Sequence, residues 1–326
     1  MADTGAASAP RSLKSPVCVT VSALDAGHLT LPEHLFITDA DPSKRTTVPS
    51  LSFLIQHPSP RRPDRTTTKL LFDLGLKRDL SGYRTLQQQH IAQRQPISTS
   101  PDAAASLRAG GLDPADIDLV MLSHVHWDHV GTPADFSTAT FVVGAGTLRV
   151  LRDGDGPNYP RELFNADELP ADRTVELPPV RADAEEGAQV RRTEHVWAPF
   201  AGFPAAVDFF GDGSVWVIDA PGHLTGHVNL LTRVGPGRWV YLGGDCCHDV
   251  RILAGEKSIA EYEDGRGGIR SVHADTGAAR GTVERIKSFL EAGKVEGERK
   301  EEVEIVVAHD GSWREMNMER FWPGQL

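Results

Sequence analysis

The chain has 326 residues, of which 40% are hydrophobic and 24% are charged. This composition is typical of a globular protein with a sizeable core, in one large domain or two small ones, and no apolar run reaches the roughly 20 residues of a membrane-spanning helix. The formal net charge of -11 disfavours nucleic acid and anionic membranes as partners.

The cysteine content and the first residues predict a cytoplasmic protein. Three cysteines occur, Cys18, Cys246 and Cys247, and an odd number with two adjacent is typical of a reducing compartment rather than of a disulfide framework. Residues 1–16 are small and polar and lack the apolar centre of a secretion signal. We therefore expect a disordered tail over 1–16 and a single domain over 17–326.

Apolar runs rich in β-branched and aromatic residues alternate with turns along most of the chain, and they predict a mixture of strands and helices. Asp102 and the pair Gly110–Gly111 mark the start and the end of the first helix. In chain order we predict strands over 17–24, 50–57 and 69–75, a helix over 101–111, strands over 116–123, 139–146, 214–220, 228–234 and 238–245, a helix over 276–293, and a last strand over 301–310.

The stretch "SHVHWDHVG", residues 123–131, carries four metal-binding side chains within six positions, three histidines and an aspartate, directly after an apolar strand. In an extended loop, residues two positions apart point the same way, so His124 and His126 can chelate one ion. The turn at Asp128 and His129 then directs these two side chains at a neighbouring ion. Such a density of donors favours a metal site over a structural role.

Three further donors follow apolar runs downstream. His223 comes after a Pro-Gly turn in "VIDAPGHLTGH", Asp245 ends "WVYLGGD", and His309 ends "EIVVAHD". A fold that brings strand ends to one edge would gather all of these donors with the histidine loop. Imidazole and carboxylate groups without an obligatory thiolate suit zinc, and seven donors suffice for two ions.

On these motifs the chain resembles the metallo-β-lactamase fold hydrolases. "SHVHWDHVG" matches their H-x-H-x-D-H signature, "APGHLTGH" resembles their P-G-H-T-x-G-H turn, and "YLGGD" and "VVAHD" resemble their strand-end aspartate and last histidine. The resemblance runs from about residue 17 to 315 and implies an α/β fold, a four-layer αββα sandwich with the metals at one edge. "FDLG" and "LDPADIDLVMLSHVHWDHVG" look most like the branch that includes N-acyl-homoserine-lactone lactonases.

The resemblance also implies roles for individual residues. Two Zn²⁺ ions are expected, the first held by His124, His126 and His223, the second by Asp128, His129 and His309, with Asp245 as the bridge between them. His227 and Asp73 are expected to orient ligands rather than to bind metal. In this arrangement a hydroxide that bridges the metals attacks a carbonyl, and Asp128 carries the proton to the leaving group.

His248 lies three positions after Asp245, where lactone-hydrolysing relatives have a tyrosine that polarises the substrate carbonyl. A histidine there is expected to donate a hydrogen bond to the developing oxyanion or to protonate the leaving group, unless it turns outward to water. Cys246 and Cys247 stand beside the bridging aspartate. They are interpreted as small buried residues rather than as thiolate ligands.

The sequence predicts hydrolysis of a small cyclic ester or amide, a lactone or a lactam. His126 stands where flavodiiron proteins carry an acidic residue, which favours zinc hydrolysis over iron redox chemistry. Glyoxalase-II-like thioesterases share all seven ligands and stay open as an alternative, as does a non-catalytic metal-binding protein on the same scaffold. An RNase-Z-like nuclease is disfavoured by the net charge of -11.

Residues 152–205 are rich in Pro, Asp and Glu and are interpreted as an insertion that lies over the metal edge. Its aromatics Trp197, Phe200 and Phe203 are expected to line the substrate pocket, with packing of the insertion onto the body as the alternative. The expected partner is a small-molecule substrate, neither nucleic acid nor membrane, and a homodimer stays open.

Overall fold

The computed structural model describes residues 15–181 and 190–326. Residues 1–14 of the predicted tail and residues 182–189 of the predicted insertion lie outside this description. Across the two described ranges, no helix is both long and apolar enough to cross a membrane.

The first of two six-stranded sheets holds the N-terminal half of the chain. Its spatial order is β1 (Thr20–Pro32), β2 (Arg45–His57), β3 (Thr68–Phe72), β4 (Leu119–Met121), β5 (Thr140–Val143) and β6 (Thr174–Glu176). Strands β1 to β3 pair antiparallel, whereas β3 to β6 pair parallel. The parallel strands therefore all end at the same edge of this sheet.

The second sheet holds the C-terminal half and follows the same principle. Its spatial order is β14 (Glu302–Val307), β11 (Arg238–Gly243), β10 (Val228–Gly235), β9 (Val215–Asp219), β8 (Phe203–Asp208) and β7 (Ala198–Phe200). β11 and β14 are parallel, and β10 runs antiparallel between β9 and β11. Hence β9, β11 and β14 end at a common edge.

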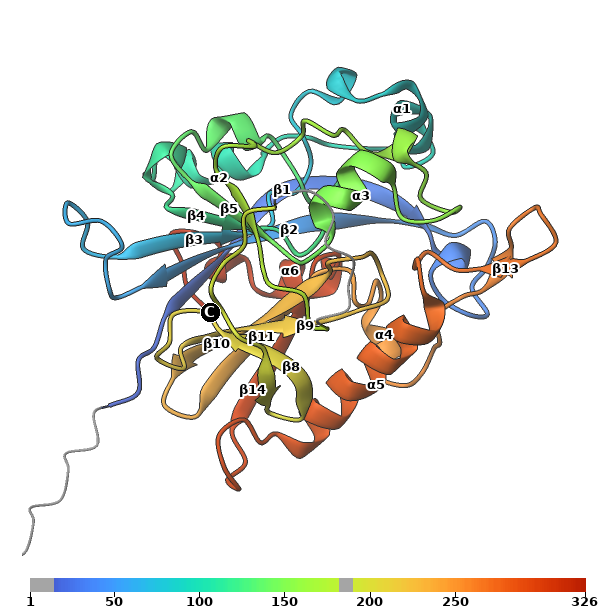
Figure 1. Cartoon of the computed structure of the whole chain (residues 1–326). Coiled ribbons are helices and arrows are strands. Elements are labelled where there is room, and N and C mark those ends of the chain that lie inside the picture. Colours follow the sequence, from blue (N-terminus) through green and yellow to red (C-terminus); the bar gives the residue numbers. More distant parts are fainter. Residues whose placement is uncertain (1–14, 182–189) are drawn as a thin grey trace, which may run out of the picture.

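The two sheets pack face to face, with helices on both outer surfaces (Figure 1). A buried apolar cluster joins the inner faces, with Phe53, Met121 and Leu230 among its members. The helices α2 (Ala103–Ala109) and α3 (Thr147–Asp153) pack on the first sheet, and α4 (Val250–Leu253) and α5 (Thr276–Ala292) pack on the second. The predicted four-layer αββα sandwich is confirmed.

Shorter elements complete the chain. The helix α1 (Thr85–Ala92) lies near the first sheet, α6 (Gly311–Met316) follows the last strand, and β12 (Tyr262–Glu263) pairs with β13 (Ile269–Arg270) in a separate small hairpin. Each predicted strand and helix matches a described element. β1 runs on to Pro32, well past its predicted end.

The long helix α5 illustrates how local sequence produces these layers. The Asp275 carboxylate accepts a hydrogen bond from the Ala278 backbone N–H at 2.9 Å, which caps the first turn, and Gly293 ends the helix in a left-handed conformation with φ 57°. Val283, Ile286 and Phe289, spaced three apart, lie buried against the second sheet.

Residues 152–205, expected as an insertion, contribute strands to both sheets. β6 pairs with β5 at the edge of the first sheet, and β7 and β8 form the edge of the second, where β8 pairs with β9. The described part of this stretch is therefore the connection between the two halves of the fold. Its strands are short, and polar residues separate them, so the sequence pattern does not reveal them.

A tight turn at Gly222, just after β9, packs against the start of α5. Gly222 has φ 130°, and a Cβ there would lie 2.2 Å from the Ala279 backbone nitrogen. The carbonyl oxygens of Gly222 and His223 accept hydrogen bonds from the N–H groups of Asp275 and Ala274, both at 2.9 Å. Only glycine allows this close approach, and the approach sets the position of His223.

We expect Gly222→Ala to destabilise the protein by roughly 2 kcal/mol or more, because the methyl group must displace the start of α5. Gly211→Ala is the matched control: Gly211 has φ 73° but nothing within 4 Å of the added atom, so backbone strain alone remains, about 1 kcal/mol. Denaturant unfolding of both variants measures the difference. Equal destabilisation would contradict the steric argument.

Candidate metal centre

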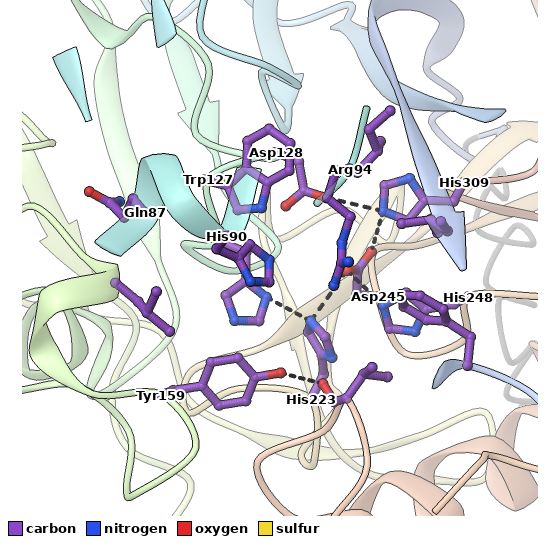
Figure 2. A pocket seen from close by; sticks show the side chains of 16 residues that line it. Gln87, His90, Arg94, Trp127, Asp128, Tyr159, His223, Asp245, His248 and His309 are labelled. Carbon is purple, nitrogen blue, oxygen red and sulfur yellow. Dashed lines mark hydrogen bonds and ion pairs between the residues drawn. The ribbon is translucent and has the colours of Figure 1, made fainter. Parts of the chain in front are cut away.

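Four strand ends supply the predicted donors to one location. The loop after β4 carries His124, His126, Asp128 and His129, while His223 follows β9, Asp245 follows β11 and His309 follows β14. The structure brings all seven together in two groups of potential ligands: His124, His126, His223 and Asp245 in one, and Asp128, His129 and His309 in the other. Figure 2 shows part of this cluster at the base of a pocket.

The first group converges through three ring nitrogens. His126 Nδ1 lies 3.0 Å from His124 Nε2 and 2.9 Å from His223 Nε2. Tetrahedral zinc with Zn–N distances of about 2.0–2.1 Å places its nitrogen ligands about 3.3 Å apart, so these atoms need to separate by only a few tenths of an ångström. Burial lowers the pKa of His126 to about 3 and that of His223 well below its usual value, so both rings are neutral and offer lone pairs.

The second group combines one carboxylate with two imidazoles. His309 Nε2 lies 3.6 Å from the nearer carboxylate oxygen of Asp128. Burial alone would lower the pKa of His129, but the carboxylates of Asp245 and Asp73 outweigh it and hold that pKa well above its usual value. The negative charge around these imidazoles suits a second divalent cation.

Asp245 lies between the two groups. Its Oδ2 is 3.2 Å from His223 Nε2, whereas its Oδ1 is 3.1 Å from His129 Nε2 and 3.3 Å from His309 Nε2. One carboxylate thus presents one oxygen to each group, which is the geometry of a bridging ligand.

Orphaned polar atoms test whether a metal fits here. Within the described chain, His129 Nε2 and Asp245 Oδ1 are buried without a hydrogen-bond partner, although they lie only 3.1 Å apart. Such atoms are costly unless something else satisfies them. A cation between them would satisfy both, and nitrogen and oxygen donors are those that zinc accepts. The residues therefore fit a dinuclear zinc centre.

Asp73 holds the histidine loop from behind. Its Oδ2 accepts hydrogen bonds from His129 Nδ1 at 2.9 Å and from the Ser123 hydroxyl at 2.7 Å, and its Oδ1 accepts one from the Ser123 backbone N–H at 2.7 Å. Asp73 adopts φ 61°, a conformation uncommon outside glycine that tends to mark functional sites. These contacts fix the tautomer of His129 and leave its Nε2 free for a metal.

Hydrogen bonds also position other donors of the two groups. His227 Nε2 accepts a hydrogen bond from the Asp245 backbone N–H at 3.0 Å, so His227 positions the bridge. His309 Nδ1 donates to the Pro49 carbonyl oxygen at 2.7 Å. His223 Nδ1 lies 3.2 Å from the Nδ1 of His273. His273 was not among the predicted site residues, because an isolated histidine in "SVHADTG" carries no sequence signal.

His248 faces the cluster rather than the solvent. Its side chain is 5% exposed, its Nε2 lies 3.0 Å from Asp245 Oδ2, and its ring contacts Phe36 with ring centroids 4.8 Å apart. Its two cysteine neighbours have a different environment. Burial raises the pKa of Cys246 to about 12, and Cys247 donates a hydrogen bond to the Asp249 carbonyl oxygen. Among the described residues, neither thiol belongs to a group of potential metal ligands.

A pocket opens directly over these donor side chains (Figure 2). Its floor includes His126, Asp128, His223, Asp245, His248 and His309. Its walls are Leu29, Leu31, Phe36, Gln87, His90, Arg94, Trp127, Tyr159, Leu163 and Val272. Most of the wall is apolar or aromatic, and only Arg94 carries a permanent charge. Gln87 and His90 belong to α1, which has no apolar periodicity and was not predicted.

The three aromatics predicted to line the substrate pocket lie elsewhere. Phe200 stacks on Trp216 with ring centroids 3.6 Å apart, and Phe203 is buried against Tyr241 and Phe289. Trp197 donates a hydrogen bond to the Pro178 carbonyl oxygen at 2.7 Å. None of the three lines the pocket over the metal cluster. Their contacts correspond to the packing alternative, because β7 and β8 belong to the second sheet.

The chain is similar to known proteins in sequence and in fold. The family model described as "Metallo-beta-lactamase superfamily" matches residues 48–243. A solved N-acyl homoserine lactone hydrolase, with the product N-hexanoyl-L-homoserine bound at its catalytic metal centre, aligns over 96% of this chain and 100% of its own with a TM-score of 0.60. At 17% sequence identity this likeness concerns the fold.

Two curated relatives are similar in sequence. The cytochrome P450 monooxygenase mpaDE of Penicillium brevicompactum is 30% identical over 94% of this chain, and the gamma-lactamase FDB1 of Fusarium pseudograminearum is 30% identical over 61%. The chain spans only 35% of the first relative and 45% of the second. The names describe those whole proteins, so their activities are not transferred to this chain by similarity alone.

The contacts of Asp73 generate a test of the metal centre. We expect Asp73→Asn to lower zinc affinity by about 10- to 100-fold, because an amide cannot accept from both His129 and Ser123 as the carboxylate does. Competition with a chromogenic chelator measures the affinity. Asp79→Asn, which changes an exposed acid that caps a surface turn, is the control. Unchanged affinity in Asp73→Asn would show that Asp73 does not support the ligands.

Proposed function

The chain belongs to the metallo-β-lactamase superfamily, and we propose that it is a dinuclear zinc hydrolase that opens a small cyclic ester or amide, a lactone or a lactam. The observation that carries this proposal is the position of Asp245, with one oxygen toward each group of histidines. A complete set of seven donors, Asp245 included, supports catalysis over a non-catalytic scaffold.

The chemistry divides between the metals and the chain. Two bound Zn²⁺ ions would lower the pKa of a shared water to roughly 7 and polarise the substrate carbonyl. Asp128 lines the pocket beside His309, where its carboxylate can accept the proton and deliver it to the leaving oxygen or nitrogen. His248, which also lines the pocket, can donate a hydrogen bond to the carbonyl oxygen as negative charge develops there.

The substrate class rests on the shape of the pocket and on the relatives. A pocket with apolar and aromatic walls over the metal cluster suits a small ring that carries an apolar body. The similar proteins include one named as a gamma-lactamase and one that hydrolyses a homoserine lactone. A small-molecule substrate, a cytoplasmic location and the absence of nucleic-acid or membrane partners remain part of the proposal.

The first experiment measures hydrolysis of γ-lactones, γ-lactams and thioesters by the zinc-loaded protein. We expect turnover of a lactone or lactam, loss of activity on chelation, and close to two zinc ions per chain by elemental analysis, since seven donors exceed what one tetrahedral ion can take. Asp245→Ala should lower occupancy of both sites together. A preference for thioesters would contradict the substrate class, and one iron without zinc would contradict the metal centre.

The second experiment concerns His248. We expect His248→Ala to lower kcat at least tenfold with both metals retained, since loss of one oxyanion donor typically costs on the order of 10²–10³ in kcat. His248→Tyr should restore part of the turnover of simple lactones, because a phenol can donate the same hydrogen bond. Steady-state kinetics with zinc analysis tests this. Wild-type kcat in His248→Ala would remove the residue from catalysis.

A further inference from the structure

The pocket wall contains a buried cation, Arg94, that forms no ion pair with any carboxylate in the described part of the chain. Arg94 is only 8% exposed and lies just beyond the end of α1. Its backbone is fixed, because its N–H donates to the Ile91 carbonyl oxygen and its carbonyl oxygen accepts from Thr30 N–H, both at 2.9 Å. Figure 2 shows its side chain extending into the pocket.

The guanidinium of Arg94 has no partner among residues 15–181 and 190–326. Among the residues that the structure describes, no side chain or backbone group forms a hydrogen bond or ion pair with it. Most other buried charged groups are paired: Asp118 with Arg62, and Arg233 with Glu296. A buried charge is costly unless it is paired. An unpaired guanidinium in a pocket therefore indicates that an anionic ligand binds beside it.

Bound metal would leave less negative charge near Arg94. Burial lowers the pKa of Arg94, and the charge of Asp128 acts in the opposite direction. With zinc bound, the Asp128 carboxylate would coordinate the metal and would no longer offset the charge of Arg94. Two zinc ions with a bridging hydroxide outweigh the two carboxylates of Asp128 and Asp245, so the floor of the pocket is positive as well.

The single cation also limits what can bind. Arg94 is the only Arg or Lys that lines this pocket in the described chain. The nearby His90 does not add charge, because burial lowers its pKa to about 4. A planar guanidinium matches a carboxylate through two parallel N–H···O bonds, and one such fork neutralises a single negative charge. A phosphate group would leave charge and acceptors unsatisfied.

We propose that Arg94 binds a carboxylate of the substrate, so that the substrate is an anionic lactone or lactam with a carboxylate remote from the reacting carbonyl. This inference rests on the proposed function and narrows it. The apolar wall, with Trp127, Tyr159 and Leu163, packs the body of the substrate, while Arg94 orients it over the metals.

The kinetic experiment compares substrates that differ only in charge. γ-Butyrolactone-γ-carboxylate is compared with its γ-carboxamide, and N-succinyl-homoserine lactone with its terminal amide, which places the carboxylate on a longer arm. We expect the wild type to prefer at least one carboxylate over its amide by tenfold or more in kcat/KM. Arg94→Gln should abolish that preference mainly through a higher KM for the carboxylate substrates, with a much smaller effect on the amide substrates. Arg94→Lys should restore part of it.

Two controls separate the role of Arg94 from a structural effect. Arg84→Gln removes an exposed positive charge at the start of the same helix and should leave the preference intact. Zinc content and melting temperature of Arg94→Gln should match the wild type. Equal losses on carboxylate and amide substrates, or an unchanged ratio in Arg94→Gln, would overturn the proposal while the hydrolase activity stands.

A binding measurement distinguishes failure of this inference from failure of the proposed function. Calorimetric titration of the zinc-loaded protein with glutarate and with its monoamide, glutaramate, needs no turnover. We expect glutarate to bind at least tenfold tighter than glutaramate in the wild type and equally in Arg94→Gln. Absence of turnover on every ring with this preference present would overturn the proposed function and retain the anion site; absence of the preference would overturn the anion site.

Discussion

The rest of the site depends on the contacts that the Asp245 carboxylate makes with both groups of histidines. Asp245 follows β11, which pairs with the edge strand β14 in the second sheet, and its two oxygens face different groups of histidines. A carboxylate in this position must be held from behind, and His227 does so through the Asp245 backbone N–H. Every other ligand is arranged around this point, because strands from both sheets end beside it.

The donors come from two sheets that pack through their inner faces and are also joined by backbone hydrogen bonds, among them Val228 N–H to the Ser123 carbonyl oxygen at 2.9 Å and Leu51 N–H to the Ala308 carbonyl oxygen at 3.0 Å. The histidine loop follows β4 of the first sheet, and His223, Asp245 and His309 follow strands of the second. Because the apolar cluster between the sheets sets their spacing, it also sets the separation of the ligands. In the proposed metal centre, metal binding would therefore be coupled to the docking of the two halves, and a bound ion would stabilise the interface between them.

The sequence predicts the fold and the ligand groups because both leave local patterns. Apolar runs mark the buried strands, and donors such as His223 directly follow them. The surroundings of the ligands leave no such pattern. Arg94 and His273 are single residues whose role depends on neighbours distant in the chain. The aromatics Phe200 and Phe203 resemble pocket residues in sequence, and only their pairing in the second sheet reveals that they pack a core.

The protonated state of the buried thiols has a consequence for how the protein responds to oxidants. Peroxides attack thiolates, and access and ionisation together decide which cysteines they modify. Cys246 and Cys247 directly follow the bridging aspartate, yet both are buried, with pKa values raised by that burial. In the proposed metal centre, ligands made only of imidazole and carboxylate groups would therefore keep their affinity for metal when the redox potential of the surroundings changes, which a site built on a cysteine ligand would not.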